Sequence, residues 1–278
     1  MIINTLNIRT LTLSAILLFI HLNGFAGWVI TEESSDSYGN RSIQTTFIQN
    51  NVIRYETSTS IVIIDLSLKT ITIVFSQYKV YWVGTSDELN SSTISYYDMQ
   101  MEKMLAGLPK HQQKELDSIY SNLKQKMLNP SKPKLPNNFL MIETDSIQEI
   151  NGFNALKYNV YVDSTLTELL WHTTQVNPYA DINIDDMLAF MQQLNYSSGF
   201  SSNVQSHDYL GLLKSGLLLK SVEFLPNKNK IETKLSKIRE VDIVSEFFKP
   251  PTNYRKVSLF DALYLLPNSD LQEGGYGK

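Results

Sequence analysis

Short apolar segments recur about every ten residues between Trp28 and Val83, and polar turns separate them. Within most of these segments hydrophobic and polar residues alternate with a period of two. This spacing predicts an antiparallel meander rather than β–α–β units, because the turns are too short to contain a crossover helix. The expected strands are residues 43–47, 52–56, 61–64, 71–75 and 78–82.

The hydrophobic period becomes that of a helix after this first group of strands. Apolar residues recur at helical spacing from Tyr97 to Leu108, and Pro109 interrupts the stripe. Because proline is favoured in a first helical turn, Pro109 is expected to start a second helix, which a proline-rich segment at 129–136 ends. We interpret the two helices, at about 94–128, as an insertion within one domain rather than as a domain border.

A second group of strands is expected at residues 139–144, 153–162, 165–176, 217–225 and 231–241. Two more helices are predicted at 181–194 and 259–265, and a Ser/Asn-rich loop at 197–206. About ten strands form a sheet so wide that it must curl or be covered. The predicted fold class is therefore mainly β (α+β). It is a curved antiparallel sheet, or half-open β-barrel, covered by helical insertions in a single domain at 27–266.

The N-terminal segment has the three parts of a secretory signal peptide at 1–26. Arg9 precedes an apolar stretch at 11–20 that is too short to span a bilayer, and the small residues Gly24 and Ala26 form a cleavage site. The alternative is a buried N-terminal helix. We expect an exported, periplasmic protein that is soluble after cleavage near Ala26/Gly27, and a disordered tail at 267–278.

Composition adds to this expectation. The 278 residues include no cysteine, which favours a bacterial envelope protein over a disulfide-bonded one and argues against a lipid anchor, since lipidation at the export site requires a cysteine. No second apolar run is long enough to predict a transmembrane helix. There are 24 basic and 28 acidic residues, and without Arg9 the balance is 23 − 28 = −5, so the charge offers no footprint for nucleic acid.

Short motifs in the first strand group, and two later segments, form a recognisable series. They are Arg54-Tyr55-Glu56, Ile63-Ile64-Asp65-Leu66, Lys69 to Ile73, Tyr78-Lys79, Tyr81-Trp82, Gly107-Leu-Pro109 with His111-Gln-Gln113, and Phe247-Phe-Lys-Pro-Pro251 with Asn253-Tyr254. The series resembles the DUF4412 family of bacterial envelope proteins, which is similar to the LolA/LolB/LppX group. The resemblance implies a half-open antiparallel barrel with helices in its mouth, and it brings no catalytic residues. LolB-type members carry a lipidated cysteine that this chain lacks.

Aromatic residues of the predicted strands are candidates for the wall of a ligand cavity. In a half-barrel one face of the sheet can hold a ligand instead of side chains alone. Methionines and a leucine of the helical insertion would form an adaptable apolar lid. For each residue the alternative is ordinary core packing or cross-strand aromatic pairing. The candidate ligand-binding residues are Tyr55, Tyr78, Tyr81, Trp82, Met101, Met104, Leu108, Tyr158 and Trp171.

Residues 181–186 carry alternate oxygen-bearing side chains, as a calcium-binding loop does. However, Asp186 stands where such a loop needs glycine, and Gln192 stands where it needs glutamate. Asp181 or Asn183 is better explained as the N-cap of a helix, with acidic residues at its positive end. We therefore predict no calcium site.

No other motif for catalysis or for a cofactor is complete. The three histidines beyond the signal segment, His111, His172 and His207, are not spaced as zinc ligands. The chain has neither a Gly-x-Ser-x-Gly elbow nor a glycine-rich phosphate loop before a helix. We expect no catalytic site, metal or cofactor.

Three hypotheses of function follow. The first is a non-enzymatic protein that binds a hydrophobic ligand, such as a lipid or the acyl chain of a lipoprotein, between sheet and helices. The second is an envelope structural or interaction protein with a filled core, whose helical insertion at 95–128 docks a protein partner. The third is a hydrolase whose site has no recognisable motif.

Overall fold

The computed structural model describes residues 26–128, 138–194, 206–225 and 228–265. The predicted signal segment up to residue 25, the segment 129–136, the loop from 197 to 205 and the C-terminal tail lie outside the described residues.

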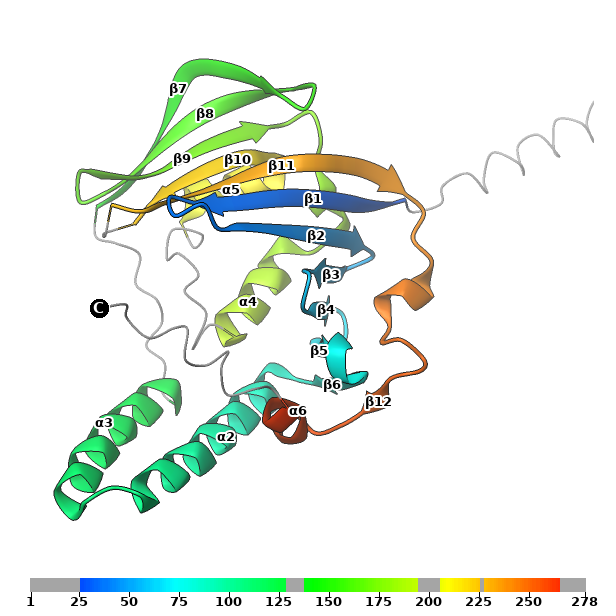
Figure 1. Cartoon of the computed structure of the whole chain (residues 1–278). Helices are drawn as coiled ribbons and strands as arrows, with labels where there is room; N and C mark the ends of the chain where they lie inside the picture. The colour runs from blue at the N-terminus through cyan, green and yellow to red at the C-terminus, as the bar shows by residue number, and fades with distance from the viewer. Residues whose placement is uncertain (1–25, 129–137, 195–205, 226–227, 266–278) are drawn as a thin grey trace, which may run out of the picture.

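The described chain contains twelve strands that form one sheet (Figure 1). In chain order they are β1 (Gly27–Asp36), β2 (Arg41–Gln49), β3 (Val52–Glu56), β4 (Ile61–Asp65), β5 (Thr70–Phe75), β6 (Val80–Gly84), β7 (Phe139–Ile150), β8 (Phe153–Val162), β9 (Thr165–Thr173), β10 (Leu217–Phe224), β11 (Lys230–Val241) and β12 (Arg255–Lys256).

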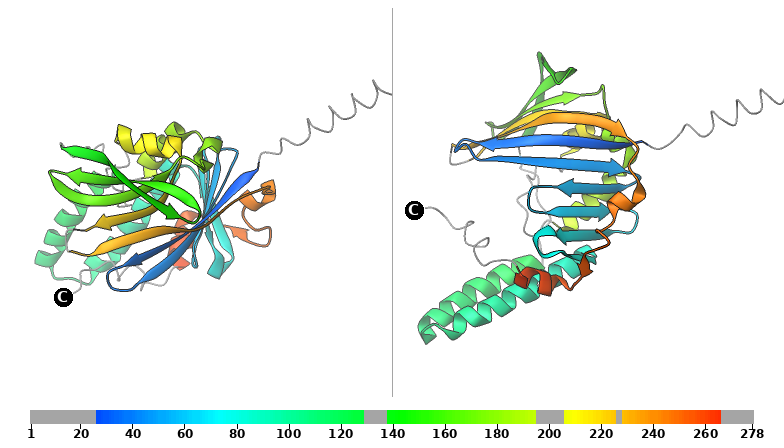
Figure 2. Two further views of the ribbon diagram at one scale, coloured as in Figure 1. Left: turned by 90° about the horizontal axis from the view of Figure 1, so that it is seen from above. Right: turned by 45° about the vertical axis from the view of Figure 1, so that its right-hand side comes forward.

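The order of strands across the sheet is β12-β6-β5-β4-β3-β2-β1-β11-β10-β9-β8-β7. All neighbours are antiparallel except β12 and β6, which are parallel. Because β12 and β7 lie at opposite ends of this order, the sheet does not close. Figure 2 shows that it curves strongly, so one face is concave. The predicted class, a curved antiparallel sheet with helical cover, is confirmed.

Five α-helices are described, and their positions define the two faces of the sheet. They are α2 (Ser86–Ala106), α3 (Lys110–Leu128), α4 (Ile184–Leu194), α5 (His207–Ser215) and α6 (Leu259–Leu265). In Figure 1, α4 lies inside the curve of the sheet, and α2 and α3 form a hairpin that projects away from the β6 end. The helix α6 packs along α2, where Phe260 contacts Tyr96 and Lys103 lies over the ring of Tyr264.

Alternation along the strands sends neighbouring side chains to opposite faces. In β3, Ile53 and Tyr55 join the main core on the face that α4 covers, whereas Arg54 points to the other side and contacts Phe247. Directly paired residues of neighbouring strands share a face, so the register assigns the side chains of the other strands to one of the two faces. We call the face with Ile53 the concave face and the face with Arg54 the outer face.

The C-terminal part of the chain crosses the outer face after β11. The short 3-10 helix η4 (Ser245–Phe248) packs on β2 and β3 through Phe247, whose ring lies 4.6 Å from that of Phe47. The chain then reaches β12 and α6 at the far edge of the sheet (Figure 1). This segment covers part of the outer face just as the helices cover the concave one.

Several details differ from the sequence-based expectation, and the strands β1 and β12 were not predicted. Tyr78 does not lie in a strand: residues 76–78 form a 3-10 turn, Lys79 has a φ of 50°, and β6 starts only at Val80. The first helix of the hairpin starts at Ser86, where Thr85 and Glu88 form a capping box, so it is longer than its hydrophobic stripe. The helix α5, which His207 begins directly after the predicted loop, was not predicted.

Candidate functional site

The structure separates the aromatic residues of the first strand group. Tyr55 and Trp82 lie on the concave face, and Trp82 is buried in the main core. Tyr81 follows the opposite alternation and pairs with Val74 on the outer face, and Tyr78 lies in the turn before β6. The predicted wall is therefore not one continuous surface.

Trp171 also lies on the outer face, where it pairs with Lys157 on one side and Lys220 on the other. The two ammonium groups lie 5.5 and 5.0 Å from its ring centroid, and Trp171, which is 8% exposed, also belongs to the main hydrophobic core cluster. Tyr158 lies on the concave face, and its hydroxyl donates a hydrogen bond to Glu143 (3.0 Å). Loss of hydration and this carboxylate raise the pKa of Tyr158 to about 12.

Met101, Met104 and Leu108 lie near the tip of the α2–α3 hairpin, which points away from the sheet (Figure 1). Met104 is exposed, and the other two are half-buried. That the nine candidate residues contact a ligand stays a prediction, but the structure does not bring them together as one cavity wall.

The concave face instead gathers carboxylates and phenols from distant parts of the chain. Glu168 of β9 and Glu223 of β10 are direct cross-strand neighbours, and Glu32 of β1 lies on the same face two strands further on. Tyr209 of α5 lies within electrostatic range of all three carboxylates.

Loss of hydration is the main cause of the raised pKa values of these carboxylates and phenols. It raises the pKa of Glu32, and it raises that of Glu168 to about 7 with a further contribution from the charge of Glu223. Loss of hydration and the charge of Glu32 raise the pKa of Tyr55 to about 12 and that of Tyr179 further still. The site is thus a partly dehydrated, acidic surface with aromatic walls.

Glu168 is the most deeply buried of these carboxylates, with 9% of its surface exposed. It has no hydrogen bond or ion pair with any other described residue. The one basic side chain on this part of the concave face, among the described residues, is His172, whose Nε2 donates to the Leu212 carbonyl (2.9 Å). Burial lowers the pKa of His172, so its ring is neutral near pH 7 and does not neutralise the acids.

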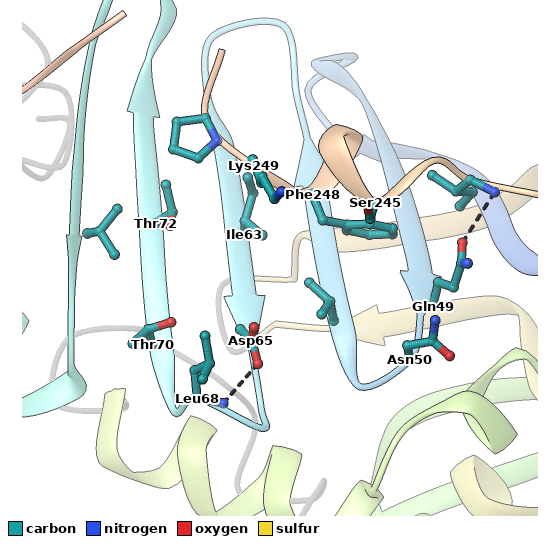
Figure 3. Close-up of a pocket in the computed structure, with 14 residues that line it drawn as sticks. Gln49, Asn50, Ile63, Asp65, Leu68, Thr70, Thr72, Ser245, Phe248 and Lys249 are labelled. Atoms are coloured by element: carbon teal, nitrogen blue, oxygen red, sulfur yellow. Dashed lines mark hydrogen bonds between the residues drawn. The ribbon is translucent and has the colours of Figure 1, made fainter. Parts of the chain in front are cut away.

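A separate groove of about 370 Å³ lies on the outer face, between η4 and strands β3 to β6 (Figure 3). Figure 3 shows Ile63, Thr72 and Phe248 around it, with Asp65 at one end accepting a hydrogen bond from the backbone of Leu68 (2.9 Å). Its walls are mostly apolar, and it holds no paired acid and base. We interpret it as the seam between the sheet and the segment that crosses it.

No metal centre is formed within the described part of the chain, where no three acidic or histidine side chains are close enough to share an ion. Residues 181–186 serve the role expected of a helix start: Asn183 accepts hydrogen bonds from the backbone of Asp185 (3.1 Å) and Asp186 (3.2 Å). None of the described helices combines the length and apolar character that crossing a membrane requires.

No family model and no curated protein matches the chain. Solved structures with partial similarity include an uncharacterized conserved protein from Thermus thermophilus, with 7% identity, TM-score 0.41 and coverage of 88% of this chain and 98% of that one. MucB of Pseudomonas aeruginosa, solved in complex with MucA, has 8% identity and TM-score 0.37, with 84% of this chain and 59% of that one covered. A LolA superfamily protein from Nitrosomonas europaea has 6% identity and TM-score 0.24, with 82% and 91% covered.

All three TM-scores lie below 0.5, so these similarities carry no information about what the protein binds or does. This chain also spans only 59% of the MucB chain. The resemblance to DUF4412 stays a prediction from the sequence, since no family model matches.

Sequence reasoning missed Glu32, Glu168 and Glu223. One signal was present: Glu168 interrupts the apolar run Leu166-Thr-Glu-Leu-Leu-Trp171 at a position that alternation assigns to the same face as Leu170. A charged residue at a core-facing position of a strand is uncommon, and it deserves a functional hypothesis.

Proposed function

We propose that this protein is a non-enzymatic binding protein that holds the apolar part of an amphipathic ligand against the concave face of its sheet. One observation carries the proposal. Apolar side chains of the concave face and of the facing helix α4 pack against the main core and remain only half-buried. They include Tyr55, Ile73, Phe75, Tyr179, Met187 and Met191.

Such a surface differs from a filled core, where side chains interdigitate and leave little apolar area accessible. Burial of apolar area against it contributes about 25 cal/mol per Å², so an extended hydrocarbon chain gains several kcal/mol of binding free energy there. Met187 and Met191 are flexible and polarizable, which suits contact with an alkyl chain of variable shape. The helix α4 therefore takes the role that the sequence assigned to the α2–α3 hairpin.

Export to the bacterial envelope is part of the proposal. It is supported by the signal-like segment at 1–26 and by the sequence resemblance to DUF4412 envelope proteins. Fractionation of the native host, with the full chain detected in periplasmic, cytoplasmic and membrane fractions, tests it. Intact-mass measurement of the exported protein would show whether the chain is cut near Ala26.

Binding is tested by native mass spectrometry of the purified protein and by titration with a fluorescent alkyl probe. Two half-buried tyrosines on opposite faces provide matched variants. We expect Tyr55→Ala, on the concave face, to weaken probe binding about tenfold, and Tyr81→Ala, on the outer face, to leave it unchanged. Equal effects of both variants, or no probe binding by folded wild-type protein, would contradict the proposal.

The non-enzymatic character is supported by the make-up of the described concave face, where Glu32, Glu168 and Glu223 form no ion pair with a described basic side chain. Its one histidine, His172, donates to a backbone carbonyl and pairs with no acid. Screens with ester and glycoside substrates are expected to show no turnover. If the wild-type protein hydrolyses a substrate and the Glu168→Gln variant does not, the hydrolase hypothesis is favoured instead.

A second function, the docking of a protein partner by the α2–α3 hairpin, is favoured by exposed apolar residues on α3. Ile119 is 60% and Leu123 is 53% exposed, one helical turn apart. The double variant Ile119→Asp/Leu123→Asp would abolish capture of such a partner and leave alkyl-probe binding unchanged. Loss of probe binding in this variant would instead assign the hairpin to the ligand site.

A further inference from the structure

We propose that the ligand of the concave face carries an organic ammonium group, which Glu168 binds together with its cross-strand neighbour Glu223. This inference rests on the proposed function and names the chemistry of the ligand's polar end.

Positive and negative side chains lie on opposite faces of strands β8 to β11 and β1. Every described lysine and arginine side chain of these strands points outward: these are Lys157, Lys220, Lys230, Lys234, Lys237 and Arg239. Glu32, Glu168 and Glu223 lie on the concave face of the same strands, where none of these basic side chains lies. A ligand entering from this side therefore meets negative charge.

Glu168 is 9% exposed as a whole residue, but its carboxylate oxygens are not among the described polar atoms that are sealed from solvent without a partner, so a ligand can reach them. A carboxylate that has lost most of its hydration normally has an ion-pair or hydrogen-bond partner, because a poorly hydrated charge is destabilising. Glu168 has neither among the described residues, although Glu223 beside it adds a second negative charge. An ammonium group between the two would supply the missing positive charge.

The described side chains fit an organic cation better than a metal ion. A metal needs three or more ligand atoms at one point, and the described side chains form no such group. The carboxylates Glu168 and Glu223 instead lie side by side on β9 and β10, and Tyr209 of α5 packs in the cluster of Val160 and Leu170 on the same face. Carboxylates and aromatic faces are the surroundings that alkylammonium groups favour.

The two halves of the concave face then match an amphiphile. The side chains around Tyr55 and Trp82 are apolar and face α4, whereas β9, β10 and the middle of β1 are acidic. Tyr55 and Glu32 are close enough to interact and mark where the two halves meet. An alkyl chain can lie on the first half while its ammonium end reaches the second.

The test compares three probes with one alkyl chain and different ends: dodecyltrimethylammonium, dodecanol and dodecanoate, each titrated into the full-length protein below its micelle concentration. We expect the cation to bind at least roughly tenfold more tightly than the alcohol, and the carboxylate to bind most weakly. Glu168→Gln should weaken binding of the cation about tenfold and leave binding of dodecanol unchanged.

Two glutamates on opposite faces of the sheet provide the control. Glu223→Gln, beside Glu168 on the concave face, should weaken binding of the cation, while Glu33→Gln, on the outer face, should not. Unfolding midpoints would verify that each variant is folded. If all three probes bind equally and Glu168→Gln changes none of them, the ammonium inference is wrong and the proposed function stands. If no probe binds, the proposed function fails as well.

Discussion

The guanidinium group of Arg54 lies 4.2 Å from the ring centroid of Phe247, although 193 residues separate the two in the chain. Arg54 also donates one hydrogen bond to the carbonyl oxygen of Phe247 and another to Glu56 Oε1 (2.7 Å). On its other side the Phe247 ring packs on Phe47. These contacts fix the C-terminal segment across the outer face of β2 and β3.

The variant Arg54→Ala should lower the free energy of unfolding by about 2–3 kcal/mol. Arg54 is only 7% exposed, and its removal takes a charge-assisted partner from both Glu56 and a backbone carbonyl while leaving a gap beneath Phe247. Urea unfolding followed by tryptophan fluorescence measures the change.

Arg41→Ala is the matched control for this prediction. Arg41 also pairs with a glutamate, Glu33, but at 3.6 Å and with 75% of its side chain exposed. Exposed pairs contribute about 0.5 kcal/mol or less, so this variant should unfold almost as the wild type does. Equal destabilisation by the two variants would show that the contact with Phe247 does not hold the segment.

Local alternation was sufficient to predict most strands. The strand Val52–Glu56 was predicted with the bounds that the structure has, because the polar residues Asn50 and Asn51 mark the turn before it. In the structure both adopt the positive φ angles that a tight hairpin turn requires. The short 3-10 turn before β6 was missed because the alternating pattern of Tyr78 to Trp82 continues through it. The helix α5 was missed because its nine residues are too few to show a clear period.

The candidate site was less predictable, for a physical reason. Alternation alone places Tyr81 and Trp82 on opposite faces, so they were not one wall. The pair Glu168 and Glu223 depends on β9 pairing with β10, and the position of Glu32 on the same face depends on β1 pairing with β11, a contact between strands about 200 residues apart. No local pattern encodes such a pairing, so the sequence could mark Glu168 as unusual without identifying its neighbours.

The variant Asp98→Asn should loosen the α2–α3 hairpin without unfolding the sheet. Asp98 accepts hydrogen bonds from the Tyr120 hydroxyl (2.9 Å) and from Lys124 Nζ (2.7 Å), which join the two helices. We expect faster hydrogen exchange of the α3 amides and a global stability within about 1 kcal/mol of wild type. Faster exchange in β3 to β6 as well would mean that the hairpin and the sheet unfold together.

The variant Glu168→Gln should change how stability depends on pH. Burial raises the pKa of Glu168 from 4.5 to about 7, so between these values the folded protein holds a proton that the unfolded chain has released. The stability from that proton is fully present below pH 4.5 and is lost as pH rises through 7. Glutamine stays neutral, so the variant should match the wild type near pH 4.5 and exceed it at pH 8, by on the order of 2–3 kcal/mol.

Thermal and urea unfolding between pH 4.5 and 8 test this difference, with Glu33→Gln as the control on the outer face of β1. The control should show the same pH dependence as the wild type. A Glu168→Gln protein that is no more stable than the wild type at pH 8 would indicate that a cation or another partner already neutralises Glu168.

Alanine substitutions of Gly211, within α5, and of Gly216, directly after it, should change the free energy of unfolding in opposite directions. Gly216 packs so closely on β9 that a Cβ there would overlap the Thr173 carbonyl oxygen and approach His172 Nε2. Gly216→Ala should therefore lower the free energy of unfolding by about 1–3 kcal/mol, because the buried backbone has no room to move.

Gly211 is exposed within α5 and has no atom near the position of a Cβ, so Gly211→Ala should stabilise the protein by roughly 0.5–1 kcal/mol through helix propensity. Urea unfolding of both variants gives the comparison. Because α5 carries Tyr209 to the acidic half of the concave face, a displaced α5 should also weaken binding of the dodecyl cation in Gly216→Ala but not in Gly211→Ala. Destabilisation by Gly216→Ala with unchanged cation binding would show that the position of α5 is not needed for the site.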